Sequence, residues 1–413
     1  MYNIRLSERI PEPQPATPVT TVAAHYYAAW KYGAAGLHEG FNDLADRFPG
    51  RTPLMGYYDE ENPEVCDWEI KWALEHGINC FIYCWYRKPD NMGKPVTVSD
   101  LRCGHGIHEA LFNASFGKYM KFAVMFEASP RWCGTDDRDL MDNLMPFWTE
   151  TYFKRDNYLT FDNKPALFIY NQKRLTEEVW RDPEAQKRAF YRCREYACKA
   201  GFDGMLFACC GHEPGREVYD DIMARGYDFR FGYNSGYIPA AHAIGDYPPE
   251  EDVAAAQLAI LDRELKLDPR RHVATASCFY DVTPRTAGRW KKLDYGFDSA
   301  YDWHLSPDNF RKVIRGMRER IKTLPEDAWA KRLFMIDNWN EWDEGHFVAP
   351  SHRFGFRYLE AVREELTLRD NLPDYRTPGD QGFGGYNKSW RTPDFGEFCK
   401  NRRGGGFGSD GSI

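Results

Sequence analysis

The apolar residues of this chain fall into eight short runs, and segments with helical periodicity separate most of them. Each run is almost continuously apolar, which is typical of strands buried on both faces of a parallel sheet. The predicted strands cover residues 22–27, 80–86, 121–127, 166–171, 205–210, 227–234, 272–281 and 333–341. Helical segments are expected near residues 62–77, 177–200, 250–266, 307–322 and 356–366. This alternation predicts an α/β fold, a (β/α)8 TIM barrel with long βα loops.

The barrel is predicted to occupy residues 21–368 as a single catalytic domain. Residues 1–20 hold four prolines without helical or strand period, so we expect an extended N-terminal arm. Residues 369–413 are rich in glycine, aspartate, arginine and aromatic residues, and we expect a partly disordered C-terminal extension. A doubly wound nucleotide-binding sheet is the rival fold. It is disfavoured because no Gly-x-Gly-x-x-Gly follows the first strand and no P-loop occurs.

The eighth apolar run changes abruptly into carboxylates, amides and indoles. Residues 333–336 are apolar, Glu341 and Glu344 follow, and Gly345 supplies the backbone freedom to leave the strand. In a TIM barrel this end of the strand faces the active-site mouth, where residues are catalytic rather than structural. Glycosidic bond cleavage needs one protonated carboxylic acid and one carboxylate that acts as base or nucleophile. We therefore predict that Glu341 and Glu344 are the catalytic pair.

Two tryptophans flank this pair. Trp339 and Trp342 are expected to offer flat apolar faces to a sugar ring and to raise the pKa of a neighbouring acid by lowering the local dielectric. A two-residue period places Asp337, Trp339 and Glu341 on one side, whereas Glu344 can join them only if the chain turns. The structural alternative is an acidic turn that merely caps the next helix.

Polar and aromatic residues also gather at the ends of other predicted strands. The expected substrate contacts there are His25, Tyr27, Trp30, Asp59, Trp85, Tyr86 and Glu127. A glutamate that ends an apolar strand is costly unless it is paired or functional, and Glu127 could instead form a salt bridge at the barrel rim. Trp85 and Tyr86 could pack the barrel, and Asp59 could brace a loop.

Composition narrows the possible partners. Aromatic residues make up 16% of the chain, with 13 Trp and 25 Tyr, which favours contact with an oligo- or polysaccharide. The net charge of −8 and the lack of a long basic run disfavour nucleic acid. No apolar run approaches the roughly 18 residues of a membrane span. Because no secretory signal is seen, a cytoplasmic location is the default expectation, or a periplasmic one if a leader has been removed. The oligomeric state is left open.

The histidines and cysteines do not indicate a metal site. The 11 cysteines are an odd, scattered set and are expected to be reduced core residues. Cys80 and Cys84 are four strand residues apart, about 13 Å, which is too far to share a zinc ion. His105 and His108 have ligand-like spacing but stand in a Gly-rich loop without a cysteine pattern. These residues imply no metal ligation, and the missing nucleotide-binding motifs weigh against a nucleotide cofactor.

An ordered set of motifs resembles the WbsX-like family, which is related to glycoside hydrolase family 99, the endo-α-mannosidases. The resemblance covers about residues 22–366. Its motifs are Tyr26-Tyr27-Ala28-Ala29-Trp30, Leu54-Met55-Gly56-Tyr57-Tyr58-Asp59, Asn62-Pro63-Glu64-Val65, His76-Gly77-Ile78, Tyr83-Cys84-Trp85-Tyr86, Lys164-Pro165-Ala166, the 338–345 segment and the 355–362 segment. The 338–345 segment contains the family 99 pattern Asn-Glu-Trp-x-Glu-Gly.

The resemblance implies a barrel that cleaves an α-linked glycan with retention, such as a mannan-like or rhamnose-containing bacterial polysaccharide, in an endo mode. It also implies that neither a metal nor an organic cofactor is needed. By position, Glu341 matches the base that acts on the sugar's own 2-hydroxyl to give a 1,2-anhydro intermediate, and Glu344 matches the general acid/base. Glu127 matches a sugar contact. The seventh-strand loop is also expected to line the site, through Tyr280, Asp281 and Arg285. Asp343 stands where the enzymes usually have histidine.

Other functions remain open at this point. WbsX-like proteins have also been labelled glycosyltransferases, and an accessory role in polysaccharide biosynthesis is a related alternative. Transfer from a sugar nucleotide needs a diphosphate site, and the sequence indicates none; the pair Asp136-Asp137 is a weak match to the Asp-x-Asp of metal-dependent transferases. A non-catalytic glycan-binding barrel is a third possibility. In such a protein Glu341 and Glu344 would not face one another.

Overall fold

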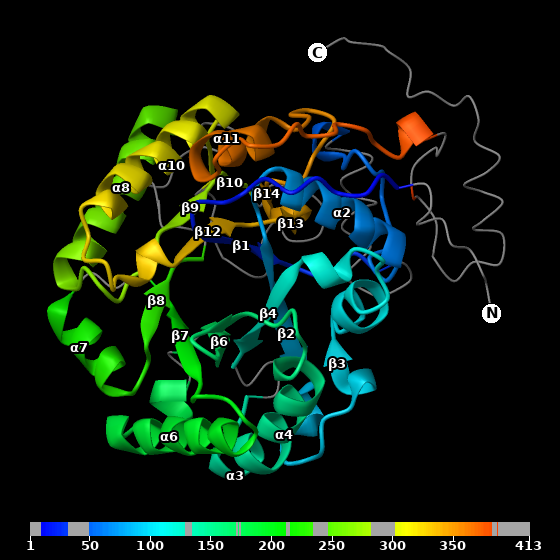
Figure 1. Cartoon of the computed structure of the whole chain (residues 1–413). Helices are drawn as coiled ribbons and strands as arrows, with labels where there is room; N and C mark the ends of the chain where they lie inside the picture. The colour runs from blue at the N-terminus through cyan, green and yellow to red at the C-terminus, as the bar shows by residue number, and fades with distance from the viewer. Residues whose placement is uncertain are drawn as a thin grey trace, which may run out of the picture.

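The computed structural model describes residues 10–31, 49–128, 134–170, 172, 175–211, 215–233, 247–281, 302–381 and 386. Eight parallel strands form its centre, in the order β8-β7-β6-β4-β2-β1-β12-β9 (Figure 1). They are β1 (Thr21–Tyr26), β2 (Cys80–Arg87), β4 (Lys121–Glu127), β6 (Lys164–Tyr170), β7 (Leu206–Cys210), β8 (Phe229–Phe231), β9 (Thr275–Ser277) and β12 (Leu333–Asp337). A parallel bridge between Arg230 and His272 joins the two ends of this order. The strands therefore make a nearly closed barrel, and the predicted TIM-barrel class is confirmed.

Helices surround the strands (Figure 1). The longer ones are α2 (Pro63–Glu75), α6 (Pro183–Lys199), α7 (Arg216–Ala224), α8 (Glu250–Leu267), α10 (Pro307–Lys322) and α11 (Arg357–Leu366). The start of α2 follows from its sequence, because the Asn62 side chain accepts a hydrogen bond from the Glu64 amide and Pro63 fits the first turn. The predicted segment 177–200 is two elements, α6 and the π-helix η10 (Leu175–Val179).

Shorter helical pieces fill the connections. Between β4 and β6 lie α3 (Asp137–Asp139), α4 (Met145–Trp148) and the π-helical segments η8 (Leu140–Leu144) and η9 (Thr149–Phe153). A further π-helix is η5 (Gly106–Leu111). Single 3-10 turns are η2 (Pro49–Arg51), η3 (Pro89–Asn91), η4 (Val98–Asp100), η6 (Gly117–Tyr119), η11 (Trp329–Lys331), η12 (Trp342–Glu344) and η13 (Gly379–Gln381).

Two of the predicted strands are too long. The predicted strand 272–281 contains β9, after which β10 (Phe279–Tyr280) leaves the barrel and pairs antiparallel with β11 (Trp303–His304). The predicted strand 333–341 stops as β12 at Asp337, and β13 (Asn340–Glu341) pairs antiparallel with β14 (His346–Phe347). In both cases the apolar and aromatic run continues after the chain has left the barrel. Two further short strands, β3 (Leu101–Arg102) and β5 (Thr160–Phe161), pair antiparallel with β2 and β6.

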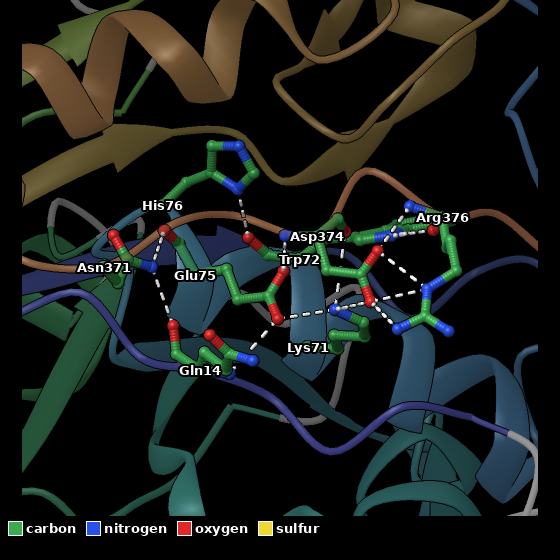
Figure 2. Close-up of polar contacts among 8 residues, drawn as sticks. All are labelled: Gln14, Lys71, Trp72, Glu75, His76, Asn371, Asp374 and Arg376. Atoms are coloured by element: carbon green, nitrogen blue, oxygen red, sulfur yellow. Dashed lines mark hydrogen bonds and ion pairs between the residues drawn. The ribbon is translucent and has the colours of Figure 1, made fainter.

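The described parts of the N-terminal arm and the C-terminal extension meet at the C-terminal end of α2 (Figure 2). Glu75 accepts hydrogen bonds from the backbone amides of Gln14 and Asp374, and the Asn371 side-chain amide donates to the carbonyls of Gln14 and Glu75. Lys71, which is fully buried, forms ion pairs with Glu75 and Asp374. Both segments are thus attached to the barrel. The predicted disorder falls mainly on the residues outside the described part, and the domain boundaries stay a prediction.

Two further findings concern the whole described chain. Nine cysteines lie in the described ranges and all of them are free thiols; they are Cys66, Cys80, Cys84, Cys103, Cys193, Cys198, Cys209, Cys210 and Cys278. The expectation that they are core residues is wrong for Cys198, which is exposed. Over the same ranges, none of the helices combines the length and the apolar character that a bilayer crossing requires.

Candidate active site

The chain turns sharply after β12, and this turn brings the two predicted catalytic residues together. Glu341 lies in β13, and the 3-10 turn η12 places Glu344 three residues later. Gly345 ends this turn with φ +69°, and a Cβ there would meet the Phe279 ring at 2.3 Å. Both the backbone conformation and the close contact therefore favour glycine at this position. The chain therefore makes the turn that Glu344 needs in order to lie beside Glu341.

A cavity opens at the C-terminal ends of the barrel strands. It encloses about 390 Å³ of empty space, part of which is open to solvent. Its lining residues are Cys84, Tyr86, Met125, Glu127, Tyr170, Tyr233, Glu341 and Glu344. The predicted strand-end residues Tyr86 and Glu127 thus line the same cavity as the predicted catalytic pair of the 338–345 segment.

Glu341 is held by two polar neighbours. The Tyr233 hydroxyl donates to Glu341 Oε2 at 2.5 Å, and Asn338 Nδ2 donates to the same oxygen at 3.3 Å and to the Tyr233 hydroxyl at 3.0 Å. Burial, and then the charge of Glu341, raise the pKa of Tyr233 well above its usual value, so this hydroxyl remains a donor. Two donors to one oxygen stabilise the ionised form of Glu341, which is only 5% exposed.

Three side chains converge at this point of the cavity. Glu341, Glu344 and His346 each offer a ligand atom, and these atoms lie within 4.8 Å of one another. His346 stands opposite Glu341 in the β13–β14 pair. Such a set of donors could hold a divalent cation as well as perform acid–base chemistry. The expectation of no metal therefore stays a prediction.

Asp337 and His25 lie beneath the cavity, inside the barrel. His25 Nδ1 is 3.3 Å from Asp337 Oδ1, and the Ser277 hydroxyl donates to the other carboxylate oxygen at 2.7 Å. Burial tends to raise the pKa of Asp337, but His346, His25 and Ser277 together hold it below its usual value. Both His25 and Asp337 are completely buried, so His25 does not reach the cavity lining where we expected a substrate contact.

The four predicted tryptophan contacts are core residues in the structure. Trp30, Trp85, Trp339 and Trp342 are each at most 2% exposed, and none of them lines the cavity. Their indole N–H groups donate to Asn340 O, Tyr152 Oη, Glu69 Oε1 and Tyr58 Oη respectively. Each indole is enclosed by protein and its N–H is already bonded, so the structure places all four in the core, and their contact with a substrate stays a prediction.

The prediction that Asp337, Trp339 and Glu341 share one side is wrong, because the two-residue period stops at the end of β12. Asp337 points into the barrel, Trp339 packs against Phe81 at a ring separation of 5.1 Å and reaches Glu69 of α2, and Glu341 faces the cavity. These three residues therefore do not share one side. On β2 the alternation holds, so Tyr86 faces the cavity whereas Trp85 packs outward.

The remaining predicted contacts lie near the rim. Tyr27 is half-buried, and its ring meets the edge of Tyr86 at a centroid distance of 6.5 Å. Tyr280 is half-buried and 5.1 Å from the His346 ring. Asp59 is buried and accepts a hydrogen bond from the Glu61 amide. Each of these substrate roles stays a prediction.

Asp281 connects two loops, and its role as a substrate contact stays a prediction. It forms an ion pair with Arg51 and accepts a hydrogen bond from the Tyr247 hydroxyl at 2.8 Å. Its backbone amide donates to the Glu344 carbonyl at 2.8 Å, which ties the seventh-strand loop to the catalytic turn. The predicted contact Arg285 lies outside the described residues.

Sequence analysis missed two tyrosines that build the cavity. Tyr170 is the last residue of β6, and Tyr233 follows β8 by two residues. Both obey the rule that polar-tipped residues at strand ends face the mouth of the barrel. Asn338 was quoted only as part of a motif, although it donates to Glu341.

The fold has counterparts among solved structures. The endo-alpha-mannosidase of family GH99 from Bacteroides thetaiotaomicron, in complex with bis-tris-propane, superimposes with a TM-score of 0.54 and 14% identity over 83% of this chain and 95% of that one. Another structure of a GH99 endo-alpha-mannosidase from this organism gives a TM-score of 0.51 and 16% identity, over 83% and 96% of the two chains. Identity this low shows a shared fold alone.

Sequence comparison gives the family. Two curated relatives, both named uncharacterized protein WxcX, come from two strains of Xanthomonas campestris pv. campestris; each is 24% identical over 347 residues, 78% of this chain. The aligned part is only 44% of their length, so the chain spans less than half of these relatives. The family described as Glycosyltransferase WbsX matches residues 134–362, more than half of the 413 residues. The resemblance seen in the motifs is confirmed, and the chain belongs to the WbsX family.

Proposed function

We propose that this protein is a retaining glycoside hydrolase that cleaves an α-linked glycan, with Glu341 and Glu344 as the catalytic pair. One observation carries the proposal: both carboxyl groups line one cavity, with oxygen atoms within 4.8 Å of each other. Carboxyl groups about 5–5.5 Å apart are typical of retention, whereas inversion needs about 6.5–9.5 Å to admit a water molecule. The same proximity argues against a barrel that only binds glycan.

The surroundings of the two carboxyl groups suggest their roles. Glu341 accepts hydrogen bonds from Tyr233 and Asn338, which favour its ionised form, so it is suited to be the base or nucleophile. Glu344 is only half-buried and can exchange a proton with water between the two steps, as a general acid/base must. In the first step Glu344 protonates the leaving oxygen. In the second it accepts a proton from the attacking water.

Two routes fit Glu341. As a base it takes the proton of the sugar's 2-hydroxyl, whose oxygen then closes a 1,2-anhydro ring as the glycosidic bond breaks. As a nucleophile it forms a covalent glycosyl ester instead. The family resemblance supports the first route. In either route water opens the intermediate and the anomeric configuration is retained.

The charge of the cavity favours a neutral glycan. Three carboxyl groups, those of Glu127, Glu341 and Glu344, line it, and the described lining residues include neither lysine nor arginine. A sugar-nucleotide diphosphate would meet like charges there, which disfavours a nucleotide-dependent glycosyltransferase in spite of the family description. Burial raises the pKa values of the lining residues Tyr86, Tyr170 and Tyr233, so their hydroxyls stay protonated and can bond sugar hydroxyls.

Mannan-like and rhamnose-containing bacterial polysaccharides are the proposed substrates, cut in an endo mode. The structural neighbours named endo-alpha-mannosidase support the first class. A transferase or accessory role in polysaccharide biosynthesis is the second candidate, favoured by the family description alone.

The test is hydrolysis of a panel of α-linked polysaccharides by the wild type, Glu344→Gln and the control Asp343→Asn. Loss of a general acid should cost at least about 10²-fold in rate. Asp343 is a half-buried neighbour outside the cavity lining, so its amide variant removes one charge without removing the acid. Retention is checked by NMR of the first-formed anomer. If no glycan is cut yet some bind equally to all three proteins, the hydrolase proposal fails and a binding or transferase role moves ahead.

A further inference from the structure

Two buried glutamates stand directly behind the catalytic loop. Glu60 follows the Leu54–Asp59 motif and Glu69 lies in α2, and both are completely buried. They contact the two residues that precede Glu341 in the chain. The Asn340 side-chain amide donates to Glu60 Oε1 at 2.7 Å, and the Trp339 indole donates to Glu69 Oε1 at 3.0 Å. The loop is therefore fixed from behind through side chains that point away from the cavity.

The other oxygen of each glutamate is also engaged. Glu60 Oε2 accepts a hydrogen bond from the Trp30 backbone amide at 2.9 Å, and Glu69 Oε2 lies 2.6 Å from the Tyr26 hydroxyl. Tyr26 is hydrogen-bonded to Glu60 as well, so its hydroxyl links the two carboxyl groups. Glu60 thus faces two N–H donors besides the Tyr26 hydroxyl, whereas Glu69 faces one N–H donor and two hydroxyls, those of Tyr26 and Tyr58.

This difference in hydrogen-bond partners indicates which of the two glutamates carries a proton. An N–H group can only donate, so both Glu60 oxygens must accept, and the ionised carboxylate suits them best. A hydroxyl can donate or accept, so Glu69 can carry a proton on Oε2 and donate it to Tyr26, which then donates to Glu60. The pair accordingly holds one negative charge, spread along a chain of hydrogen bonds.

Electrostatics disfavours two negative charges on this buried pair. Burial raises the pKa of Glu60 to about 8, and burial together with the charge of Glu60 raises the pKa of Glu69 to about 8. The titratable groups that face the pair are Tyr26, Tyr58, Asp59, Cys66, Tyr83 and His105. None of these is a lysine or arginine, and burial lowers the pKa of His105 to about 4, which keeps it neutral at pH 7.

We propose that Glu60 and Glu69 are positioning residues for Glu341: an ionised Glu60 and a protonated Glu69 fix Asn340 and Trp339, and thereby aim the Glu341 carboxylate into the cavity. This inference rests on the proposed function, since it assigns the residues that support the catalytic base. Neither glutamate touches the cavity lining, and both act through the loop.

The chain offers matched variants for a test. In Glu69→Gln the amide oxygen can accept from Trp339 while the NH₂ group donates to Tyr26, so the network survives. In Glu60→Gln the NH₂ group must face an N–H donor, and one hydrogen bond is lost. Glu69→Leu removes both acceptors. Glu75→Gln is the control, because Glu75 is a buried glutamate of the same helix that pairs with Lys71 away from the loop.

Rates and hydrogen exchange are measured together. We expect kcat to fall about 10-fold or more in Glu60→Gln and Glu69→Leu with KM changed less than about 3-fold, because one or two buried groups lose their partners. Glu69→Gln and Glu75→Gln should keep kcat within about 3-fold of the wild type. Backbone amide exchange of a peptide covering residues 337–345 should quicken in the first two variants and stay unchanged in the other two.

The outcomes separate the two proposals. If Glu69→Gln loses as much kcat as Glu69→Leu, or if the 337–345 peptide exchanges alike in all variants, the positioning role is overturned. If the wild type cuts no glycan, the proposed function fails, and the exchange pattern alone then decides whether the pair holds the loop.

A pH series tests the proton assignment independently of activity. Unfolded glutamates ionise near pH 4.5, whereas the folded pair holds its proton to about pH 8. The folded state therefore binds more protons over this window, and stability should fall as the pH rises from about 5 to 8.5. The denaturant midpoint should fall less in Glu69→Gln than in the wild type. Equal pH slopes for the two proteins would overturn the protonated Glu69.

Discussion

Two pairs of glutamates stand on opposite faces of the loop that follows β12. On the cavity face, Glu341 and Glu344 both line the cavity, Glu341 accepts hydrogen bonds from Tyr233 and Asn338, and Glu344 is half-buried. On the back face, Glu60 and Glu69 are sealed from solvent and bonded to the side chains of Asn340 and Trp339.

The comparison shows that access and partners, not residue type, separate chemistry from support. A buried carboxyl group whose oxygens are all engaged by protein donors has no way to meet a sugar, whatever its pKa. A carboxyl group that lines a cavity can meet a sugar, and its neighbours then determine whether it is protonated or ionised. The back-face pair also explains why the loop can present Glu341 rigidly, since the two residues before it are fixed from behind.

The largest effect on activity is expected when a carboxyl group on the cavity face is neutralised. In Glu341→Gln the base or nucleophile is lost, and we expect cleavage to fall about 10²–10⁴-fold. Stability should change little, because the amide oxygen can still accept from Tyr233. Initial rates on the best substrate of the panel, with denaturant midpoints, check both parts. Glycan binding should persist. A variant that loses binding and folding together would place Glu341 among the structural residues.

A substitution on the back face of the loop is expected to lower the stability of the fold and to leave contact with the sugar unchanged. Trp339→Ala removes a fully buried indole and leaves Glu69 without its N–H partner, so we expect about 3–5 kcal/mol of destabilisation. Tyr191→Ala, at a 61% exposed aromatic residue, should stay within about 0.5 kcal/mol. Equilibrium denaturation of both variants measures this. If Trp339→Ala kept its stability and lost only glycan affinity, the indole would be a sugar platform after all.

The sequence predicted those features of the fold and the site that depend on residues close together in the chain. The eight apolar runs predicted the barrel because burial on both faces leaves a local signature. The strand-end rule found Glu127, Tyr86 and the Glu341–Glu344 pair. It also applied to Tyr170 and Tyr233, each of which stands at a strand end and is followed by an asparagine, but neither tyrosine was singled out.

The errors have a physical cause as well. The two-residue period was extended past Asp337, where the chain leaves the barrel, and this misplaced Trp339. The roles of Glu60 and Glu69 depend on partners 280 and 270 residues away in the chain, for which local pattern gives no signal. Asp59, beside Glu60, was noticed instead because it belongs to a recognisable motif.

The smallest effect is expected when one hydrogen-bond donor to Glu341 is removed inside the cavity. Tyr233→Phe removes one of the two donors to Glu341 and leaves Asn338 in place, so we expect a loss of about 10-fold in kcat/KM. Losing a donor to the ionised form raises the pKa of Glu341, so the acid limb of the pH–rate profile should move to higher pH. Tyr152→Phe is the control, because it deletes a buried hydroxyl that accepts from Trp85 and lies outside the cavity lining. An acid limb that moves equally in both variants would mean that Tyr233 supports the fold and not the charge of Glu341.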